Sequence, residues 1–289
     1  MSFRPFRRQS SYVAPRRDKP KRDGGLLRSL LILAVLAWML RSFIVAPFSI
    51  PSGSMLPTIY IGDYLMVAKW PYGYSRFSFP FGIPSFKGRI FSQVPERGDV
   101  VVFRPPGEDV DFIKRVIGLP GDTIEVRNGM LVINGKPIPR RSIGSIGVPV
   151  SDNSPCRVVA PATRMIGTTA VGDPACLYPA YTETLPGGRT YVVLDQIEDP
   201  RIDDMSPVSV PEGHLFLMGD NRDDSLDSRF SPVEGGIGFV PMENLVGRAM
   251  VMFWSTDGSA SYWKPWTWFS ALRTDRIGNG FSGVPAGEQ

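Results

Sequence analysis

The sequence predicts a mainly β protein, with an N-terminal transmembrane helix followed by a β-rich domain. Glycine and proline are abundant, with 30 and 28 residues among 289, and they favour short strands joined by turns. Short apolar segments alternate with turn residues from Ile59 onward, and no long amphipathic helical pattern interrupts them. The hydrophobic content of 43% is enough for a substantial core in one or two domains.

Residues 1–24 form a basic segment without an apolar period, which predicts a disordered tail. The rest of the chain is close to neutral, so the net charge of +4 comes from this tail. A basic tail is also typical of nucleic-acid binding, but the apolar segment that follows favours a tail beside a membrane. Because basic residues concentrate before Leu30, we expect a cytoplasmic N-terminus and no nucleic-acid partner.

Residues 25–48 predict a single transmembrane helix. The uncharged segment Leu30–Leu40 is too short alone, but apolar residues on both sides extend it towards the roughly 20 residues that a span needs. A cleaved secretory signal is the alternative, yet no Ala-X-Ala site follows and Pro47 is a poor neighbour for one. A retained span places residues 49–289 outside the membrane as an extracytoplasmic domain.

Eight short apolar segments predict the strands of this domain. They are Tyr64–Ala68, Asp99–Phe103, Phe112–Ile117, Thr123–Val126, Met130–Ile133, Tyr191–Leu194, His214–Met218 and Leu245–Trp254. The Asn128-Gly129 pair favours a tight hairpin turn between two of them. Residues 140–210, rich in turn residues, predict a second β lobe or a long insertion, and residues 72–94 are a further addition without a clear period.

The two cysteines, Cys156 and Cys176, both fall in the part of the chain predicted to be exported. A disulfide between them suits an oxidising compartment. A metal pair lacks further ligands, and two free thiols are the other alternative. We expect a disulfide without a catalytic part.

Aromatic residues are concentrated near the C-terminus, in Tyr262–Phe269, and arginines follow them. Aromatic side chains beside cations suit a membrane interface. Packing in the core is the alternative.

Two segments carry the candidate chemistry. Ser54 lies between a glycine and a methionine just after an apolar stretch, and Lys114 lies in a run that is apolar apart from Arg115. The chain has one histidine, His214, in a predicted strand, so a serine hydrolase built here needs another base. A lysine can serve if burial lowers its pKa. Ser54 and Lys114 therefore predict a nucleophile and its base.

A third segment, Gly219–Arg229, is polar and turn-prone directly after a predicted strand. Its aspartates raise the possibility of a calcium loop, but an EF-hand needs a central glycine and a closing glutamate that are not in place. We predict no metal. Ser225 is a candidate to orient the lysine by a hydrogen bond, and the charged residues of the segment are candidates to pair and to rigidify it.

Four segments, in this order, resemble those of bacterial type I signal peptidases, the membrane-bound Ser-Lys proteases that remove signal peptides. They are Ser52–Thr58, Arg97–Phe103, Ile113–Asp122 and Gly219–Arg229. The resemblance covers residues 25–254 in outline, without a motif in 72–94 or 140–210. Phe112 departs from the pattern, since many members carry tyrosine there, and one span precedes the serine where some members have two.

The resemblance implies roles for the motif residues. Ser54 is the nucleophile, Lys114 the general base, and Ser225 helps to position the lysine amine. The Ser52 hydroxyl and the Ser54 backbone N–H form the oxyanion hole. Supporting ion pairs come from Arg115, Asp220, Asp227 and Arg229.

The resemblance also implies a reaction, a substrate and a location. An acyl-enzyme forms and is hydrolysed without a metal or cofactor. The substrates are preproteins with small residues at the first and third positions before the cut, and membrane lipid is a further partner. The enzyme is a single-pass protein of the bacterial plasma membrane, with a periplasmic catalytic domain. The apolar residues expected to line its substrate pockets are Phe48, Ile50, Met55, Ile59, Leu65, Val102 and Ile113.

Two other functions are weighed against this one. A self-cleaving Ser-Lys repressor is disfavoured by the predicted span and by the lack of a DNA-binding helical domain. A non-catalytic, membrane-tethered β scaffold that binds envelope peptides would keep the fold but would not need Ser54 or Lys114.

Overall fold

The computed structural model describes residues 24–157, 166–169, 172–261, 263–281 and 284–285. The chain divides into two compact units, Met1–Ala37 and Trp38–Gln289. The predicted tail, residues 1–24, lies outside the described residues except for its last residue. The second unit is mainly β, which confirms the predicted fold class.

The predicted transmembrane segment is helical for most of its length. Helix α1 (Gly24–Met39) continues into a π-helical turn, and the 20 residues Gly25–Ile44 are long and apolar enough to cross a membrane. The prediction that the helix extends to residue 48 is wrong, because Val45–Ser49 is strand β1. Pro47 has no N–H for a helical hydrogen bond, and the segment pairs with β2 instead.

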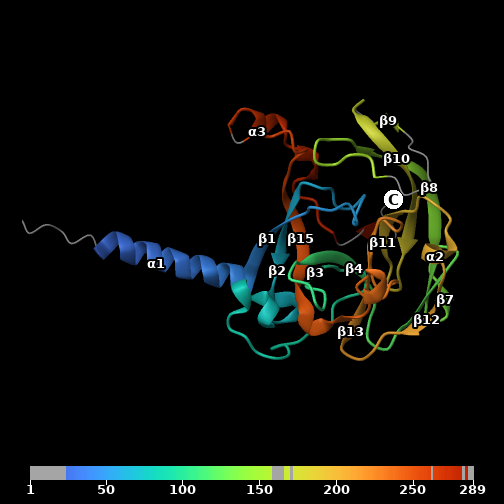
Figure 1. Cartoon of the computed structure of the whole chain (residues 1–289), viewed down its shortest axis with the longest axis horizontal. Helices are drawn as coiled ribbons and strands as arrows, with labels where there is room; N and C mark the ends of the chain where they lie inside the picture. The colour runs from blue at the N-terminus through green and yellow to red at the C-terminus, as the bar shows by residue number, and fades with distance from the viewer. Residues whose placement is uncertain (1–23, 158–165, 170–171, 262, 282–283, 286–289) are drawn as a thin grey trace, which may run out of the picture. The chain divides into compact units, whose positions relative to one another are not determined.

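The largest sheet has the strand order β1-β2-β15-β3-β4-β13-β14, with antiparallel neighbours throughout (Figure 1). Its strands are β1 (Val45–Ser49), β2 (Asp63–Ala68), β15 (Leu245–Ser255), β3 (Val100–Phe103), β4 (Phe112–Gly118), β13 (His214–Met218) and β14 (Val240–Pro241). All four residues of β3 are buried, as expected of an apolar central strand.

Two strand edges of this sheet have no partner strand among the described residues: the outer edge of β1 and the first part of β4. Strand β1 pairs with β2 alone, and β13 meets β4 only from Arg115 to Gly118. The first part of β4, Phe112 to Lys114, therefore pairs with β3 on one side, and its other edge has no partner strand in the described part of the chain. Open edges offer backbone donors and acceptors to an added peptide strand.

Two smaller sheets complete the described part of the second unit. One has the order β16-β11-β10-β8 with β9 beside β10, and the other has the order β12-β5-β6-β7. Figure 1 shows these sheets on the side of the unit away from β1. Their strands are β8 (Arg140–Pro149), β9 (Ile166–Thr168), β10 (Pro174–Thr184), β11 (Arg189–Leu194), β16 (Val284–Pro285), β5 (Thr123–Arg127), β6 (Met130–Ile133), β7 (Lys136–Pro137) and β12 (Met205–Ser209).

The predicted hairpin forms between β5 and β6. Asn128 and Gly129 adopt φ angles of 50° and 71°, the left-handed pair that a tight primed turn requires. Strands β8 to β12 lie within residues 140–210. Four of them, β8 to β11, belong to one sheet, and β12 pairs with β5 in the other small sheet.

Short helices α2 (Pro200–Asp203) and α3 (Thr267–Ser270) lie at the periphery. The aromatic C-terminal segment is exposed: Trp263 is 92% and Phe269 80% accessible. The core-packing alternative is therefore wrong for these side chains, while Tyr262 lies outside the described residues.

Candidate active site

The structure joins the two residues that the sequence singled out. Ser54 follows β1, Lys114 lies on the open edge of β4, and a hydrogen bond of 2.7 Å connects Lys114 Nζ to Ser54 Oγ. The amine also donates to the carbonyl oxygen of Ile113 across 3.1 Å. Both side chains are buried, with 8% of Ser54 and 4% of Lys114 exposed. The pair is therefore shielded from water while it lines a cleft.

Burial lowers the pKa of the Lys114 amine from its ordinary value of 10.5 to about 8. The carboxylates of Asp227, Asp220 and Asp224 oppose this shift, and Arg229 adds to it. Because desolvation penalises the ammonium form, about half of the amine is neutral at pH 8 and roughly a tenth at pH 7. A neutral amine beside a hydroxyl is able to accept its proton.

Ser225 lies in the same cleft, but it does not make the predicted hydrogen bond. Its Oγ is buried and has no hydrogen-bond partner among the described residues. The loop passes very close to the nucleophile here, because a Cβ on Gly219 would lie 2.3 Å from Ser225 Oγ and 2.5 Å from the Ser54 carbonyl oxygen. Only glycine fits at position 219, a requirement that our sequence reasoning missed although the residue opens the polar segment.

Ion pairs hold this loop against the sheet. Arg115 donates to both carboxylate oxygens of Asp220, at 2.8 and 2.6 Å, and both side chains are 1% exposed. Arg229 pairs with Asp227 across 2.9 Å. The structure therefore pairs the four charged residues that the resemblance named. Arg222 instead reaches out of the segment, to the carboxylate of Glu183 on β10.

Asn221 fixes the backbone of the nucleophile, and sequence reasoning did not single it out. Its backbone N–H donates to the Ser54 carbonyl and its side-chain Nδ2 to the Gly53 carbonyl, each across 3.1 Å. In a trans peptide the N–H points away from the preceding C=O. The Ser54 N–H therefore points away from Asn221.

The cleft around the Ser54–Lys114 pair has a volume of about 680 Å³. Ser52, Ser54 and Ser225 border it, together with four of the predicted pocket residues: Phe48, Ile50, Val102 and Ile113. The prediction is wrong for the other three, Met55, Ile59 and Leu65, which are fully buried in the core beneath the cleft. Their side chains point inward from the turn after Ser54 and from the core face of β2.

A residue of the insertion also borders the cleft. Cys156 and Cys176 form a disulfide with their Cα atoms 5.7 Å apart, so neither the metal pair nor the free thiols describe this structure. The next residue, Arg157, donates from its backbone N–H to the Tyr178 hydroxyl across 2.9 Å and from its guanidinium to Asp224 across 2.8 Å. Its side chain also packs against Gly53, where a Cβ would meet it at 2.7 Å. No motif covered this residue, which explains why sequence reasoning missed it.

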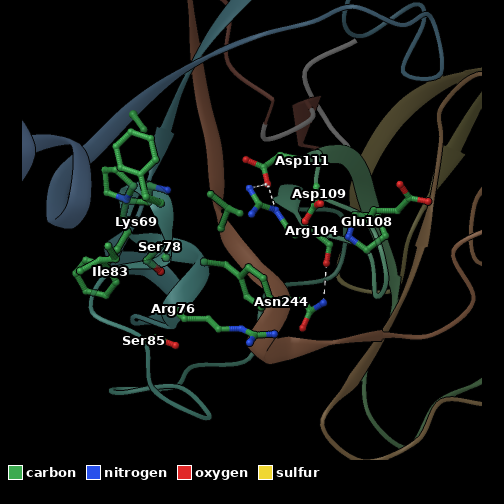
Figure 2. Close-up of a pocket in the computed structure, with 18 of the residues that line it drawn as sticks. Lys69, Arg76, Ser78, Ile83, Ser85, Arg104, Glu108, Asp109, Asp111 and Asn244 are labelled. Carbon is green, nitrogen blue, oxygen red and sulfur yellow. Dashed lines mark hydrogen bonds and ion pairs between the residues drawn. The ribbon is translucent and has the colours of Figure 1, made fainter.

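A second cavity, of about 710 Å³, adjoins the cleft at Phe48 and Asp111, which border both (Figure 2). We call it the basic cavity after the four cationic residues that line it: Arg41, Lys69, Arg76 and Arg104.

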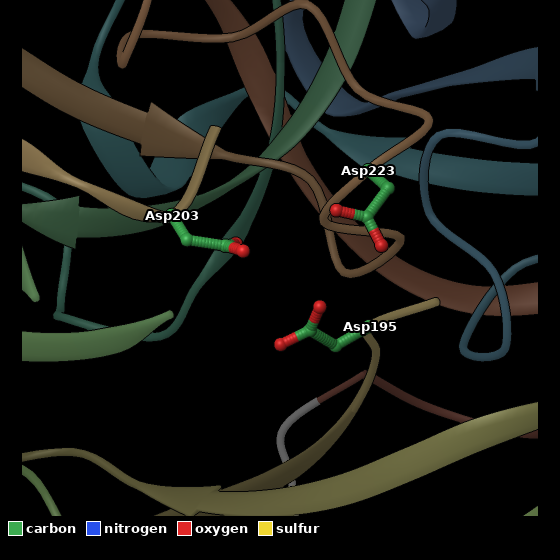
Figure 3. A group of neighbouring side chains, drawn as sticks. All are labelled: Asp195, Asp203 and Asp223. Atoms are coloured by element: carbon green, nitrogen blue, oxygen red, sulfur yellow. The ribbon is translucent and has the colours of Figure 1, made fainter. Parts of the chain in front are cut away.

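Three carboxylates face one another between β11 and the loop after β13 (Figure 3). Ligand atoms of Asp195, Asp203 and Asp223 all lie within 4.8 Å of one another. Asp195 is paired with Arg140, and Asp203 accepts a hydrogen bond of 2.7 Å from the Asp199 N–H. Asp223 accepts a hydrogen bond of 3.2 Å from the Ile197 N–H, so each of the three carboxylates has a partner within the protein.

Comparison with known proteins identifies the family. A family model described as signal peptidase, peptidase S26, matches residues 24–254. Signal peptidase I of Rickettsia typhi is 37% identical over 86% of this chain and 90% of its own length, and that of Rickettsia canadensis is likewise 37% identical with the same coverage. A crystal structure of a signal peptidase I from Enterococcus faecalis aligns over 54% of this chain and 97% of its own, with 24% identity and a TM-score of 0.27. By the family model and the sequence relatives, this chain belongs to the signal peptidase family of serine proteases, peptidase S26.

Proposed function

We propose that this chain is a membrane-bound serine endopeptidase that cleaves N-terminal signal peptides from exported preproteins through a Ser54–Lys114 dyad. The observation that carries the proposal is the 2.7 Å contact between Lys114 Nζ and Ser54 Oγ in a buried site that opens onto a cleft. His214 does not border this cleft, so the lysine is the base within reach.

The reaction follows from this geometry. The neutral Lys114 amine takes the Ser54 proton while Oγ attacks the scissile carbonyl carbon, and a tetrahedral oxyanion forms. The resulting ammonium then protonates the leaving amine, the C–N bond breaks, and an acyl-enzyme remains. Water attacks the ester with the same amine as base, which releases the new carboxylate and restores the Ser54 hydroxyl.

The oxyanion site is formed by the Ser54 N–H and the Ser52 hydroxyl. The Asn221 bond to the Gly53 carbonyl supports this assignment, because it turns the Ser54 N–H away from Asn221. Ser52 borders the same cleft with an exposed side chain, so its hydroxyl is free to rotate towards a bound carbonyl. Each such donor contributes about 3–4 kcal/mol to the transition state. Ser225 acts by hydrogen bonding to the Lys114 amine once substrate is bound, which gives its unpaired hydroxyl a partner.

The substrate lies extended in the cleft. The open edges of β1 and of Phe112–Lys114 on β4 supply backbone partners for a peptide strand that leads to Ser54. Apolar side chains at Phe48, Ile50, Val102 and Ile113 leave shallow pockets that suit small residues at the first and third positions before the cut.

The protein is anchored in the membrane by the helical segment that ends at Ile44, with membrane lipid around it. The basic residues before Leu30 support a cytoplasmic N-terminus, with the catalytic unit outside, in the periplasm. Protease added to intact spheroplasts tests this orientation, since it should digest the catalytic unit and leave the tail protected. The scaffold alternative finds no support in these observations.

Cleavage of a model preprotein by the detergent-solubilised protein tests the function. Wild type should cleave, Ser54→Ala should not, and Ser142→Ala, at an exposed serine on β8, should behave as wild type. Cleavage by Ser54→Ala at the wild-type rate contradicts the proposal.

A further inference from the structure

Lys69, at the end of β2, is the unusual member of the basic cavity. Its side chain is only 3% exposed, and no hydrogen-bond or ion-pair partner for Nζ exists among the described residues. The nitrogen lies over the ring of Phe48, 5.6 Å from the ring centroid. Burial lowers the pKa of Lys69 to about 7. Lys69 lines the cavity, and an ammonium largely removed from bulk water is stabilised by a ligand oxygen that accepts its hydrogen bonds.

The other charges of the cavity leave one wall positive. Arg104 is paired with Asp111 across 2.8 Å. Arg41 and Arg76 have no carboxylate partner among the described residues, and Arg76 stacks on a phenylalanine instead. Figure 2 shows Lys69 and Arg76 on one side of the cavity and the acidic residues of the β3–β4 loop on the other. The exposed carboxylates Glu108 and Asp109 repel further negative charge, so a singly charged group suits the site better than a multiply charged one.

The cavity lies where the membrane helix ends. Arg41 belongs to the candidate span Gly25–Ile44 and also lines the cavity. The Phe43 ring packs edge-on against Phe79, another lining residue, at 5.3 Å, and the Lys69 N–H donates to the Ile44 carbonyl across 3.0 Å. These contacts hold the last turn of the span against the cavity wall. Because the ends of a span lie at the membrane interface, we infer that the cavity lies near the level of the lipid headgroups.

We propose that the basic cavity binds the phosphate of a membrane phospholipid headgroup, with Lys69, Arg41 and Arg76 as its charged contacts. Ammonium and guanidinium groups are strong donors to a phosphate oxygen, and a phosphodiester carries the single negative charge that the cavity accepts. Phe81 and Ile83, which are 96% and 66% exposed on the cavity rim, suit contact with the interface.

The lipid site rests on the membrane anchoring in the proposed function and does not depend on catalysis by Ser54 and Lys114. A headgroup in the basic cavity lies beside the peptide cleft, because Phe48 and Asp111 border both. Ser54→Ala, which abolishes cleavage under the proposed function, should keep the lipid effect described below. Failure of one proposal is therefore distinguishable from failure of the other.

The test is thermal unfolding of the full chain in dodecyl maltoside micelles. One sample contains dioleoylphosphatidylcholine, a second contains dioleoylglycerol, which has the same chains without phosphate, and a third contains inorganic phosphate. Ligand binding to the folded state raises Tm, by about 2–3 °C at ten times Kd for a chain of this size. We expect this rise with phosphatidylcholine, and little or none in the other two samples.

The variants are Lys69→Met, Arg76→Gln and, as a matched control, Lys136→Met at an exposed lysine on β7. Lys69→Met should lose the phosphatidylcholine shift, and its Tm without lipid should be at least that of wild type because a buried unpaired charge is gone. Arg76→Gln, at an exposed site, should fold and weaken the shift, and the control should keep it. An equal rise with inorganic phosphate overturns the lipid assignment in favour of a small-anion site. A rise retained in Lys69→Met, or no rise in wild type, overturns the site itself.

Discussion

The side-chain amide of Asn221 donates a hydrogen bond of 3.1 Å to the carbonyl oxygen of Gly53. This bond fixes the peptide plane that joins Gly53 to Ser54. In the proposed mechanism it therefore orients the Ser54 N–H, an oxyanion donor, although Asn221 itself does not touch the substrate. Asn221 is fully buried, so loss of its side chain leaves the Gly53 carbonyl without this donor inside the protein.

Asn221→Ala should lower kcat by about 10–100-fold and change KM by less than about threefold, because the misaligned N–H affects the transition state more than substrate binding. Steady-state kinetics on a model preprotein measure both. The matched control is Asn244→Ala, another buried asparagine whose Nδ2 donates to a backbone carbonyl, that of Arg104, across 2.6 Å. Equal losses in the two variants would mean that Asn221 acts only on stability.

The Arg157–Asp224 ion pair should influence the pKa of Lys114. Asp224 is one of the carboxylates that raise the pKa of Lys114, beside Asp227 and Asp220, and Arg157 neutralises it. Arg157→Ala should therefore move the acidic limb of kcat/KM to higher pH, by about half a unit for a screened charge.

A double-mutant cycle checks this prediction. Asp224→Asn alone should move the limb to lower pH, and Arg157→Ala combined with Asp224→Asn should cancel the upward shift. A limb that stays shifted in the double variant would show that Arg157 acts by another route.

The disulfide should stabilise the fold without taking part in catalysis. It closes a loop of 20 residues between Cys156 and Cys176, and a loop of that length is worth about 3 kcal/mol. The double variant Cys156→Ser with Cys176→Ser should have a Tm lower by several degrees and near-normal turnover at 25 °C. Calorimetry measures the Tm, and a cleavage assay on the same sample measures turnover. Lost turnover with an intact fold would contradict the claim that the disulfide takes no part in catalysis.

Asp223 should destabilise the fold as pH rises. Burial raises its pKa from 3.8 to about 6, with Asp195 and Asp203 adding to the effect. The folded state binds this proton more tightly than the unfolded state, so stability is lost as pH rises from about 4 to 6 and stays lost above.

Asp223→Asn removes the charge and keeps an oxygen for the Gln196 and Ile197 N–H groups. The variant should be more stable than wild type at pH 8 by about 1–2 kcal/mol, after allowance for solvent screening of a partly exposed group. The gain should vanish near pH 4. A gain that does not change between these pH values points to a cause other than the charge.

Ser54 and Lys114 could be predicted because each lies in a short contiguous segment whose neighbours set its environment. The apolar residues around Lys114 predict a buried strand, and burial lowers the pKa of the Lys114 amine. The pocket residues were harder. An apolar side chain near a nucleophile can face the cleft or the core, and local sequence does not decide which, so Met55 and Leu65 were assigned wrongly.

The residues that sequence reasoning missed act through long-range contacts. Arg157 lies over a hundred positions from Gly53, and only the disulfide and β10 bring it to the cleft. The helix end was misplaced because hydrophobicity continues from the span into β1, and the change of structure comes from strand pairing.

The pH dependence of kcat/KM in wild type and in His214→Ala tests the central claim, the Ser54–Lys114 dyad, most directly. With the pKa of Lys114 lowered to about 8, both proteins should show an acidic limb near pH 8, and activity should rise as the amine loses its proton. A limb near pH 6.5, the ordinary range of an imidazole, that disappears in His214→Ala would contradict the account.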